Sequence, residues 1–108
     1  MSTPESNVLD AVCEYLHKQG HFFFRVNNVG VYDTVKGIHR TPPKWAMKGV
    51  SDVILVWKGK TYFIEIKSPV GKLSPDQIAF QAHVEDNDVD YFVVRSIDEI
   101  MRLFPNRA

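Results

Sequence analysis

Apolar residues near the N-terminus recur at helical spacing and predict an opening helix. Thr3 and Pro4 suit its start, because threonine caps a helix and proline lacks the N–H that stays unpaired in the first turn. Gly20 marks its end. The aromatic and β-branched run at 22–26 then predicts a strand. The inward stripe of the helix comprises Val8, Leu9, Val12, Cys13 and Leu16.

Two apolar runs within 51–66, separated by a short polar break that contains a glycine, predict a β-hairpin. Both faces of these strands are apolar, as in the middle of a covered sheet. If the loop consists of Lys58 and Gly59, Asp52 lies directly opposite Glu65 on one face. An odd loop sends the two carboxylates to opposite faces, so a shared site requires an even loop or a compensating bulge.

The rest of the pattern predicts two more helices and one more strand. The stretch 28–48 is long and polar, so we expect an extended functional loop, with or without a small hairpin. Ser74 and Ser96 are expected helix caps, and 91–94 has the pattern of a buried strand. The predicted order is α-β-β-β-α-β-α, an α/β fold in one domain, 1–108. The second helix should pack through Ile78, Ala79, Ala82 and Val84, and the third through Ile97, Ile100, Met101, Leu103 and Phe104.

The chain carries 13 basic and 13 acidic residues, so its zero net charge by itself predicts no polyanion partner. Between 34 and 48, however, every formal charge is positive. Such a segment either holds phosphates or is an ordinary solvated loop. Trp45 and Tyr32 in the same loop either stack on exposed bases or anchor the core. The positive residues are Lys36, Arg40, Lys44 and Lys48.

Asp52, Glu65 and Lys67 form the chemically most informative set. Two unit charges about 5 Å apart repel by roughly 3 kcal/mol at an effective dielectric near 20, so opposed carboxylates favour a bound cation. Lys67 projects from the face of Glu65, and the Ile66 carbonyl offers a further oxygen. Oxygen ligands suit Mg²⁺ or Mn²⁺ and not structural zinc. The alternative, a surface hairpin whose charges are merely solvated, fits poorly with apolar neighbours on both faces.

The single cysteine, Cys13, excludes an internal disulfide and suits a reducing, intracellular compartment. No apolar run approaches the roughly 18 residues of a membrane span, and no signal-peptide pattern is visible. We therefore expect a cytoplasmic protein with no membrane partner.

Six motifs follow one another along the chain: Glu5, Arg25-Val26-Asn27, Gly49-Val50-Ser51-Asp52, Glu65-Ile66-Lys67, Leu73-Ser74-Pro75-Asp76-Gln77 and Tyr91-Phe92-Val93-Val94-Arg95-Ser96. In this order they resemble the PD-(D/E)xK nuclease superfamily and, in local detail, its VRR-NUC (virus-type replication-repair nuclease) branch. The resemblance implies a restriction-endonuclease-like αβββαβ core, with a mixed central sheet flanked by helices and an extra C-terminal helix. Ser51 departs from the family, which commonly has proline there; proline holds no metal, so we expect activity to survive.

The resemblance also implies roles for individual residues. Glu5 would contribute to the metal directly or through water, although an acid is also favoured at a helix N-terminus for its dipole alone. Gln77 would act near the site, although a capping box with Ser74 explains the same residue. The implied catalytic residues are Asp52, Glu65, Lys67 and Gln77; the implied metal ligands are Asp52, Glu65, Ile66 and Glu5; and the implied nucleic-acid contacts are Arg25, Asn27, Lys36, Arg40, Lys44 and Lys48.

The function implied in this way is a Mg²⁺- or Mn²⁺-dependent DNA endonuclease that hydrolyses phosphodiester bonds. Stand-alone members of this branch resemble junction-resolving enzymes that act as symmetric dimers, so the resemblance implies branched or four-way-junction DNA as substrate and a homodimer. Two identical sites related by a two-fold axis would suit paired nicks. Two other hypotheses stay open: a catalytically inactive nucleic-acid-binding subunit of the same fold, and a small module that binds a non-nucleic partner. The sequence leaves open the number of metal ions, the preferred DNA structure and the dimer interface.

Overall fold

Six strands and three helices occur in the part of the chain that the computed structural model describes, residues 3–26, 32–33, 38–39 and 43–105. The strands are β1 (Phe22–Arg25), β2 (Tyr32–Asp33), β3 (Ile38–His39), β4 (Val53–Trp57), β5 (Lys60–Ile66) and β6 (Asp90–Val94). The main sheet has the order β1-β4-β5-β6, in which β6 runs parallel to β5 and the other pairs are antiparallel. The sheet is therefore mixed, as expected. β2 and β3 form a separate ribbon in the long loop.

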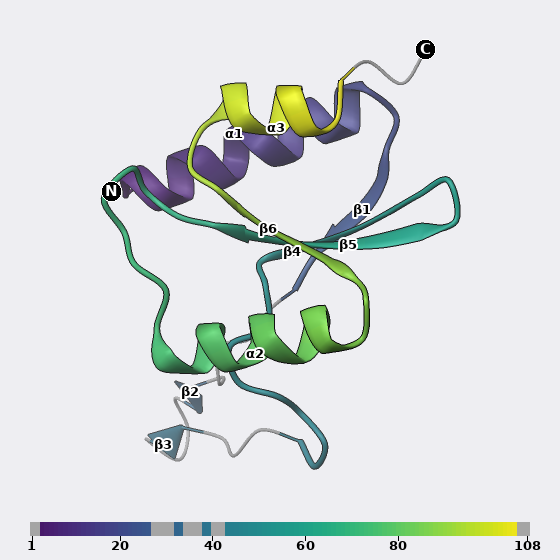
Figure 1. Ribbon diagram of the computed structural model, residues 1–108. Helices are drawn as coiled ribbons and strands as arrows, with labels where there is room; N and C mark the ends of the chain where they lie inside the picture. The colour runs from purple at the N-terminus through teal and green to yellow at the C-terminus, as the bar shows by residue number, and fades with distance from the viewer. Residues whose placement is uncertain (1–2, 27–31, 34–37, 40–42, 106–108) are drawn as a thin grey trace.

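The helices cover the two faces of the main sheet (Figure 1). They are α1 (Pro4–Lys18), α2 (Pro75–Asp86) and α3 (Ile97–Leu103). α1 and α3 lie together on one face, and α2 lies on the other (Figure 1). Each helix begins at its predicted cap, because Thr3, Ser74 and Ser96 each accept a hydrogen bond from the backbone N–H three residues on. None of the described helices is both long and apolar enough to span a bilayer.

The β4–β5 hairpin has the two-residue loop that a shared site requires. Lys58 and Gly59 have φ angles of 51° and 78°, the left-handed pair of a tight hairpin turn whose twist matches the strands. Trp57 consequently pairs with Lys60, and Val53 pairs with Ile64. One step beyond Val53, the same register places Asp52 opposite Glu65.

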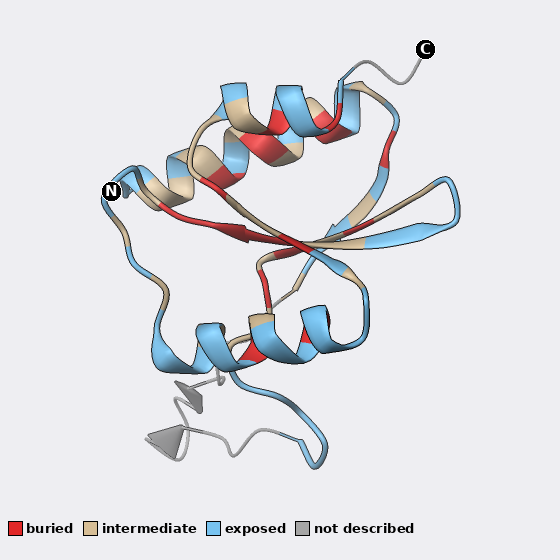
Figure 2. Cartoon of the chain, viewed as in Figure 1, coloured by how far each residue is buried: buried red, intermediate tan, exposed pale blue. Residues whose placement is uncertain are grey.

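The larger core fills the space between the sheet and the α1–α3 layer, where buried residues follow the strands (Figure 2). The predicted stripe of α1 is confirmed, since three of its members are buried and the other two pack against the core: Leu9, Val12 and Leu16, with Val8 and Cys13 beside them. The opposing strand residues are Val53, Leu55, Ile64, Ile66 and Val94.

α3 contributes fewer residues to this core than its pattern predicts. Ile100 and Phe104, four residues apart, are buried. Ile97, Met101 and Leu103 are 37%, 46% and 37% exposed, so the expectation that they point inward is wrong. Met101 and Leu103 lie to either side of the Ile100–Phe104 stripe. Ile97 lies on the stripe, but it is in the first turn of α3 and lines an open hollow beside α1, so it stays partly exposed.

A smaller core lies between the sheet and α2. Phe80 and Val84 from the helix are buried against Tyr91 of β6, and Phe63 of β5 packs beside them with its ring centroid 5.4 Å from that of Phe80. The aromatic contacts fix α2 over β5 and β6, the strands that lead to the candidate site.

The prediction of which α2 residues pack against the sheet was wrong, except for Val84. Ile78 is 55% exposed, and Ala79 and Ala82 are exposed as well. The reason lies at Gln77, whose side chain turns toward the sheet: Phe80 and Val84 follow it by three and seven residues, on the same face of the helix. Ile78, one residue on, is rotated about 100° away from that face.

Candidate active site

Two carboxylates meet where β4 begins and β5 ends. Asp52 and Glu65 lie opposite one another in the register, on the sheet face that also carries Phe63 and α2. Asp52 Oδ2 accepts a hydrogen bond of 2.7 Å from the backbone N–H of Ile66, which ties the first carboxylate to the neighbouring strand. Glu65 is only 1% exposed. The structure therefore brings together the two acids that the sequence pattern paired.

Gln77 forms the predicted capping box and also contacts the buried acid. Its Oε1 accepts a hydrogen bond of 2.8 Å from Ser74 N, and its own N–H donates to Ser74 Oγ at 3.2 Å, which is the predicted capping box. Its Nε2 simultaneously donates to Glu65 Oε2 at 3.1 Å. The start of α2 is thus bonded directly to the buried acid.

Lys67 lies between the two acids that flank it. Its Nζ is 3.8 Å from Glu65 Oε2 and 3.8 Å from Glu5 Oε1, and its side chain is 11% exposed. Glu5 reaches it from the first turn of α1, with a half-exposed side chain. The ammonium group therefore joins α1, on one face of the sheet, to the Glu65 carboxylate on the other.

Glu65 lies in an environment that disfavours its charge. Burial first, and then the hydrogen bond and the charge of neighbouring Asp52, raise the pKa of Glu65 from its ordinary value of 4.5 to about 9, while Lys67 opposes the shift. Glu65 Oε1 is buried and has no hydrogen-bond partner while the carboxylate is ionised. Ionised carboxylates only accept hydrogen bonds, so the pair needs either a shared proton or a cation between its oxygens.

A divalent cation fits this donor set. Asp52, Glu65 and the Ile66 carbonyl offer hard oxygen atoms of the kind that Mg²⁺ and Mn²⁺ prefer, and the buried Glu65 Oε1 lacks any other partner. Within the described ranges, no three or more His, Cys, Asp and Glu side chains form a group that could hold a metal. Glu5 accordingly lies across Lys67 and not beside the two acids.

Gly49 explains why α2 begins so close to the acids. Its φ angle is +78°, and a Cβ atom there would overlap the backbone carbonyl of Asp76 and lie 2.8 Å from Gln77 N. Only glycine allows both the left-handed backbone and this close approach. Gly49 therefore places the N-terminus of α2, and with it the Gln77 side chain, against the segment that leads to Asp52.

Sequence reasoning gave no role to Arg95, which the structure places just behind Lys67. Its guanidinium donates to the backbone carbonyls of Ser68 at 2.8 Å and Gly71 at 2.6 Å. Lys67 N also bonds to Val94 O at 3.0 Å, directly beside Arg95. A charged donor thus holds the turn after Lys67. The sequence contained Arg95 within the Tyr91–Ser96 motif, but no spacing rule predicts that its side chain binds the carbonyls of 68–71.

The residues expected to contact nucleic acid are placed only in part. Lys44 and Lys48 are exposed on the segment that leads to Gly49. Arg25 is exposed too, but it pairs with Val53, so it projects from the α1 face, opposite to the acids. Its contact with DNA from the sheet edge stays a prediction. Asn27, Lys36 and Arg40 lie outside the described residues.

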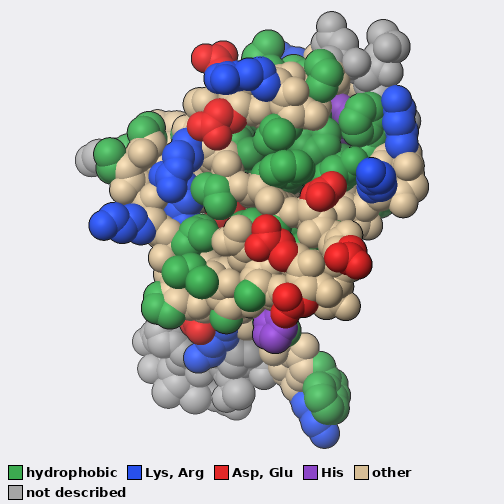
Figure 3. Space-filling model, viewed as in Figure 1, with side chains coloured by type: hydrophobic (Ala, Val, Ile, Leu, Met, Phe, Trp, Pro, Cys, Tyr) green, Lys and Arg blue, Asp and Glu red, His purple; other side chains and the backbone are tan. Residues whose placement is uncertain are grey.

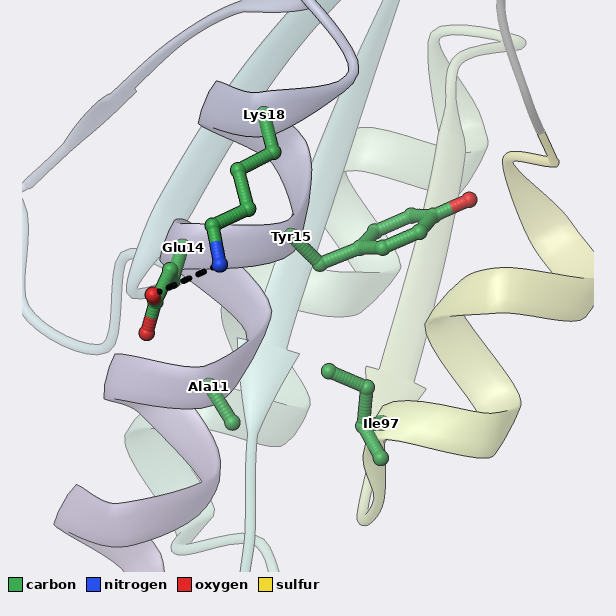
Figure 4. A pocket seen from close by; sticks show the side chains of 5 residues that line it. All are labelled: Ala11, Glu14, Tyr15, Lys18 and Ile97. Carbon is green, nitrogen blue, oxygen red and sulfur yellow. Dashed lines mark ion pairs between the residues drawn. The ribbon is translucent and has the colours of Figure 1, made fainter.

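An open hollow of about 260 Å³ lies on the other side of the sheet, between α1 and α3 (Figure 4). Tyr15 and Ile97 form its walls, and its rim carries an ion pair of 3.0 Å between Lys18 and Glu14. The Tyr15 hydroxyl donates to Phe104 O at 2.7 Å, which links the two helices. Among the described residues that line this hollow, Glu14 is the one acidic residue, so they provide no pair of carboxylates. The candidate active site is therefore the one on the α2 face.

Comparison with known proteins agrees with this geometry. The family model named VRR-NUC domain matches residues 41–98, more than half of the chain. A solved structure titled "VRR_NUC domain" superimposes with a TM-score of 0.66 and 18% identity, over 99% of this chain and 100% of that one. No curated protein sequence matches the chain. The fold is of the nuclease type, with the expected mixed sheet and flanking helices.

The chain belongs to the VRR-NUC domain family, as its motifs indicated. Nucleases of this family generally depend on divalent metal ions. The matched region contains Asp52, Glu65, Lys67 and Gln77, whereas Glu5 precedes it.

Proposed function

We propose that the protein is a Mg²⁺- or Mn²⁺-dependent DNA endonuclease that hydrolyses phosphodiester bonds, with residues 1–108 acting as one catalytic module. The observation that carries this proposal is the pairing of half-buried Asp52 with buried Glu65, whose Oε1 atom lacks a hydrogen-bond partner and whose pKa is raised to about 9. An acid kept so deep without a cation or a shared proton is costly, and such perturbed groups concentrate at functional sites.

Asp52, Glu65 and the Ile66 carbonyl would hold the cation, with Glu5 contributing through water. When bound, the ion supplies Lewis-acid stabilisation of phosphate charge and makes hydroxide accessible near neutral pH. The protein fixes the ligands beforehand: Ile66 N orients Asp52, and Gln77 Nε2 orients Glu65. Such outer contacts set the direction of a ligand and its affinity for the ion.

Lys67 would balance the charge of the phosphate and orient the attacking water. Its ammonium is nearly buried and is aligned by carboxylates on two sides, Glu65 and Glu5. A charge fixed in a poorly hydrated position stabilises developing negative charge better than one that must reorganise. Gln77 is a positioning residue, because it touches Glu65 and not the substrate.

Branched or four-way-junction DNA is the substrate we infer, with a homodimer as the active form. The support is the exposed basic segment with Lys44 and Lys48, directly before Gly49. One site of this kind cuts one strand, and two sites related by a two-fold axis place two cuts symmetrically. Sedimentation of the protein alone and on a junction tests the dimer separately from cleavage.

The test is nicking of four-way-junction, flap and linear duplex DNA with Mg²⁺, with Mn²⁺ and with EDTA. Asp52→Asn and Lys67→Ala should lose at least about 100-fold in single-turnover rate, as expected when a transition-state charge contact is removed. Lys18→Ala is the matched control, since Lys18 is an exposed lysine in an ion pair on the far side of the sheet. Its rate should equal that of the wild type.

Activity that survives in EDTA or in Asp52→Asn contradicts the proposal. DNA binding with a steep salt dependence but no cleavage with any divalent ion identifies the inactive binding subunit instead. Cleavage of all three DNAs at equal rates removes the preference for branched substrates and leaves the nuclease assignment intact.

A further inference from the structure

An exposed tryptophan occupies the tip of the segment that precedes β4. Residues 43–46 form a turn closed by a hydrogen bond of 3.1 Å from Ala46 N to Pro43 O, and Trp45 takes the third position with φ of 74°. Its side chain is 90% exposed, and Met47 beside it is 51% exposed. In Figures 1 and 3 this segment projects below α2, clear of the body of the protein.

This placement excludes one of the two roles that the sequence left open for Trp45. A core anchor would be buried, and the indole is not. Burying a large aromatic side chain is worth roughly 1.5–3 kcal/mol, which this protein forgoes while holding the residue in a backbone conformation that few L-residues adopt. A hydrogen-bonded turn that begins at Pro43 therefore displays the indole to solvent.

The surroundings of the indole match a flat aromatic ligand that carries negative charge nearby. Lys44 Nζ lies 5.2 Å from the centre of the Trp45 ring, and Lys48 is exposed three residues on. No acidic residue occurs between 43 and 51. Exposed aromatic rings interleaved with lysines are the arrangement on which bases of single-stranded nucleic acid stack, with the phosphates reaching the lysines.

The segment is also anchored to the site that we propose cleaves DNA. Gly49 packs its backbone against Asp76 and Gln77, so the chain between Trp45 and Asp52 is held at Gly49 against the start of α2. Asp52 lies seven positions after Trp45, and seven fully extended steps of the chain span at most about 25 Å. That reach is about seven base-pair steps of duplex DNA, taken as 3.4 Å each.

We propose that Trp45 is a stacking platform for an unpaired base that lies within about seven nucleotides of the bond to be cleaved. Lys44 and Lys48 neutralise the phosphates on either side of this base. The inference rests on the proposed DNA nuclease function, and it adds the feature by which branched DNA would be distinguished from a plain duplex: bases freed from pairing at the branch point.

The test compares two fluorescein-labelled probes in EDTA, a fully paired duplex and the same duplex with a single-stranded tail. By anisotropy, Trp45→Ala should weaken binding of the tailed probe about 5- to 100-fold and change binding of the paired probe by less than about twofold. Trp45→Phe keeps an aromatic face and should recover most of the affinity. Met47→Ala removes an exposed apolar neighbour without an aromatic ring and should behave as the wild type.

Intrinsic fluorescence gives a second readout, because the tailed probe should quench the wild type but not Trp45→Phe. Thermal unfolding should show that Trp45→Ala folds normally, as expected for a side chain that contacts little. An equal loss on both probes, no loss on the tailed probe, or the same loss in Met47→Ala overturns the inference. Binding in EDTA needs no catalysis, so failure of the nuclease assay and failure of stacking are separate results.

Discussion

Replacing Gly49 with alanine tests whether α2 is positioned by its contact with the turn before Asp52. The added Cβ would overlap Asp76 O and lie 2.8 Å from Gln77 N, closer than a Cβ atom approaches another heavy atom in folded proteins. The start of α2 must therefore shift, and Gln77 must move away from Glu65 Oε2, to which it now donates at 3.1 Å. We expect Gly49→Ala to lose both stability and activity.

Gly59→Ala is the matched control for this substitution. Gly59 has the same φ of +78°, but a Cβ there meets nothing within 4 Å. In both variants, alanine in the left-handed region of φ lowers the free energy of unfolding by about 1–2 kcal/mol. Gly49→Ala carries in addition an overpacking cost of about 1–3 kcal/mol, so it should unfold several degrees below Gly59→Ala.

The assay is urea unfolding of both variants, followed by single-turnover cleavage under conditions where each is folded. A displacement of about 1 Å at a catalytic group is worth up to roughly 100-fold in rate, so Gly49→Ala should be slower than Gly59→Ala by a factor of that order. Equal stabilities, or wild-type cleavage by Gly49→Ala, would refute the claim that this contact positions Gln77.

Three further predictions concern the contacts around Glu65 and Lys67. In EDTA, the folded protein retains the Glu65 proton up to pH about 9, whereas the unfolded chain loses it near 4.5. The free energy of unfolding should therefore fall as pH rises from about 5 to 9, by at most about 1.4 kcal/mol per pH unit. Urea titrations across this pH range measure the slope, which should vanish in Glu65→Gln. Gln77→Glu keeps an oxygen for the Ser74 cap but loses the donor to Glu65, so cleavage should fall about 10- to 100-fold with the helix cap retained, and an unchanged rate would contradict the positioning role. Arg95→Ala removes donors to two carbonyls of the turn after Lys67, so it should lower the free energy of unfolding by about 1–3 kcal/mol and slow cleavage. Arg102→Ala, at an arginine of α3 bonded to Asp98 O at 3.4 Å, should do neither. Equal effects of the two variants in unfolding and cleavage assays would count against the role of Arg95.

The acid pair was predictable because its geometry follows from periodicity. Once Lys58 and Gly59 form the loop, every pair along the hairpin is fixed, and Asp52 must face Glu65. The glycine and the short polar break carry that information locally. Helix starts were predictable for the same reason, since Thr3, Ser74 and Ser96 satisfy N–H groups of their own helices.

The face that α2 presents could not be derived from its own sequence. Ile78, Ala79 and Ala82 looked suited for packing, but rotation of the helix is set by partners elsewhere in the chain, namely Glu65 bonded to Gln77 and Phe63 packed on Phe80. The turn carbonyls that Arg95 holds lie 24 and 27 residues earlier, and no local pattern encodes such contacts.

Binding of Mn²⁺ to the metal-free protein tests the central claim most directly. Titration calorimetry at pH 7.5, in two buffers with different heats of ionisation, counts both the ions bound and the protons released. With the pKa of Glu65 at about 9, we expect saturable binding with close to one proton released for the first ion, because the cation replaces the proton on this carboxyl. Glu65→Gln should abolish that binding and Glu85→Gln, an exposed acid on α2, should preserve it. An absence of saturable binding, or binding that Glu65→Gln leaves unchanged, would contradict the account.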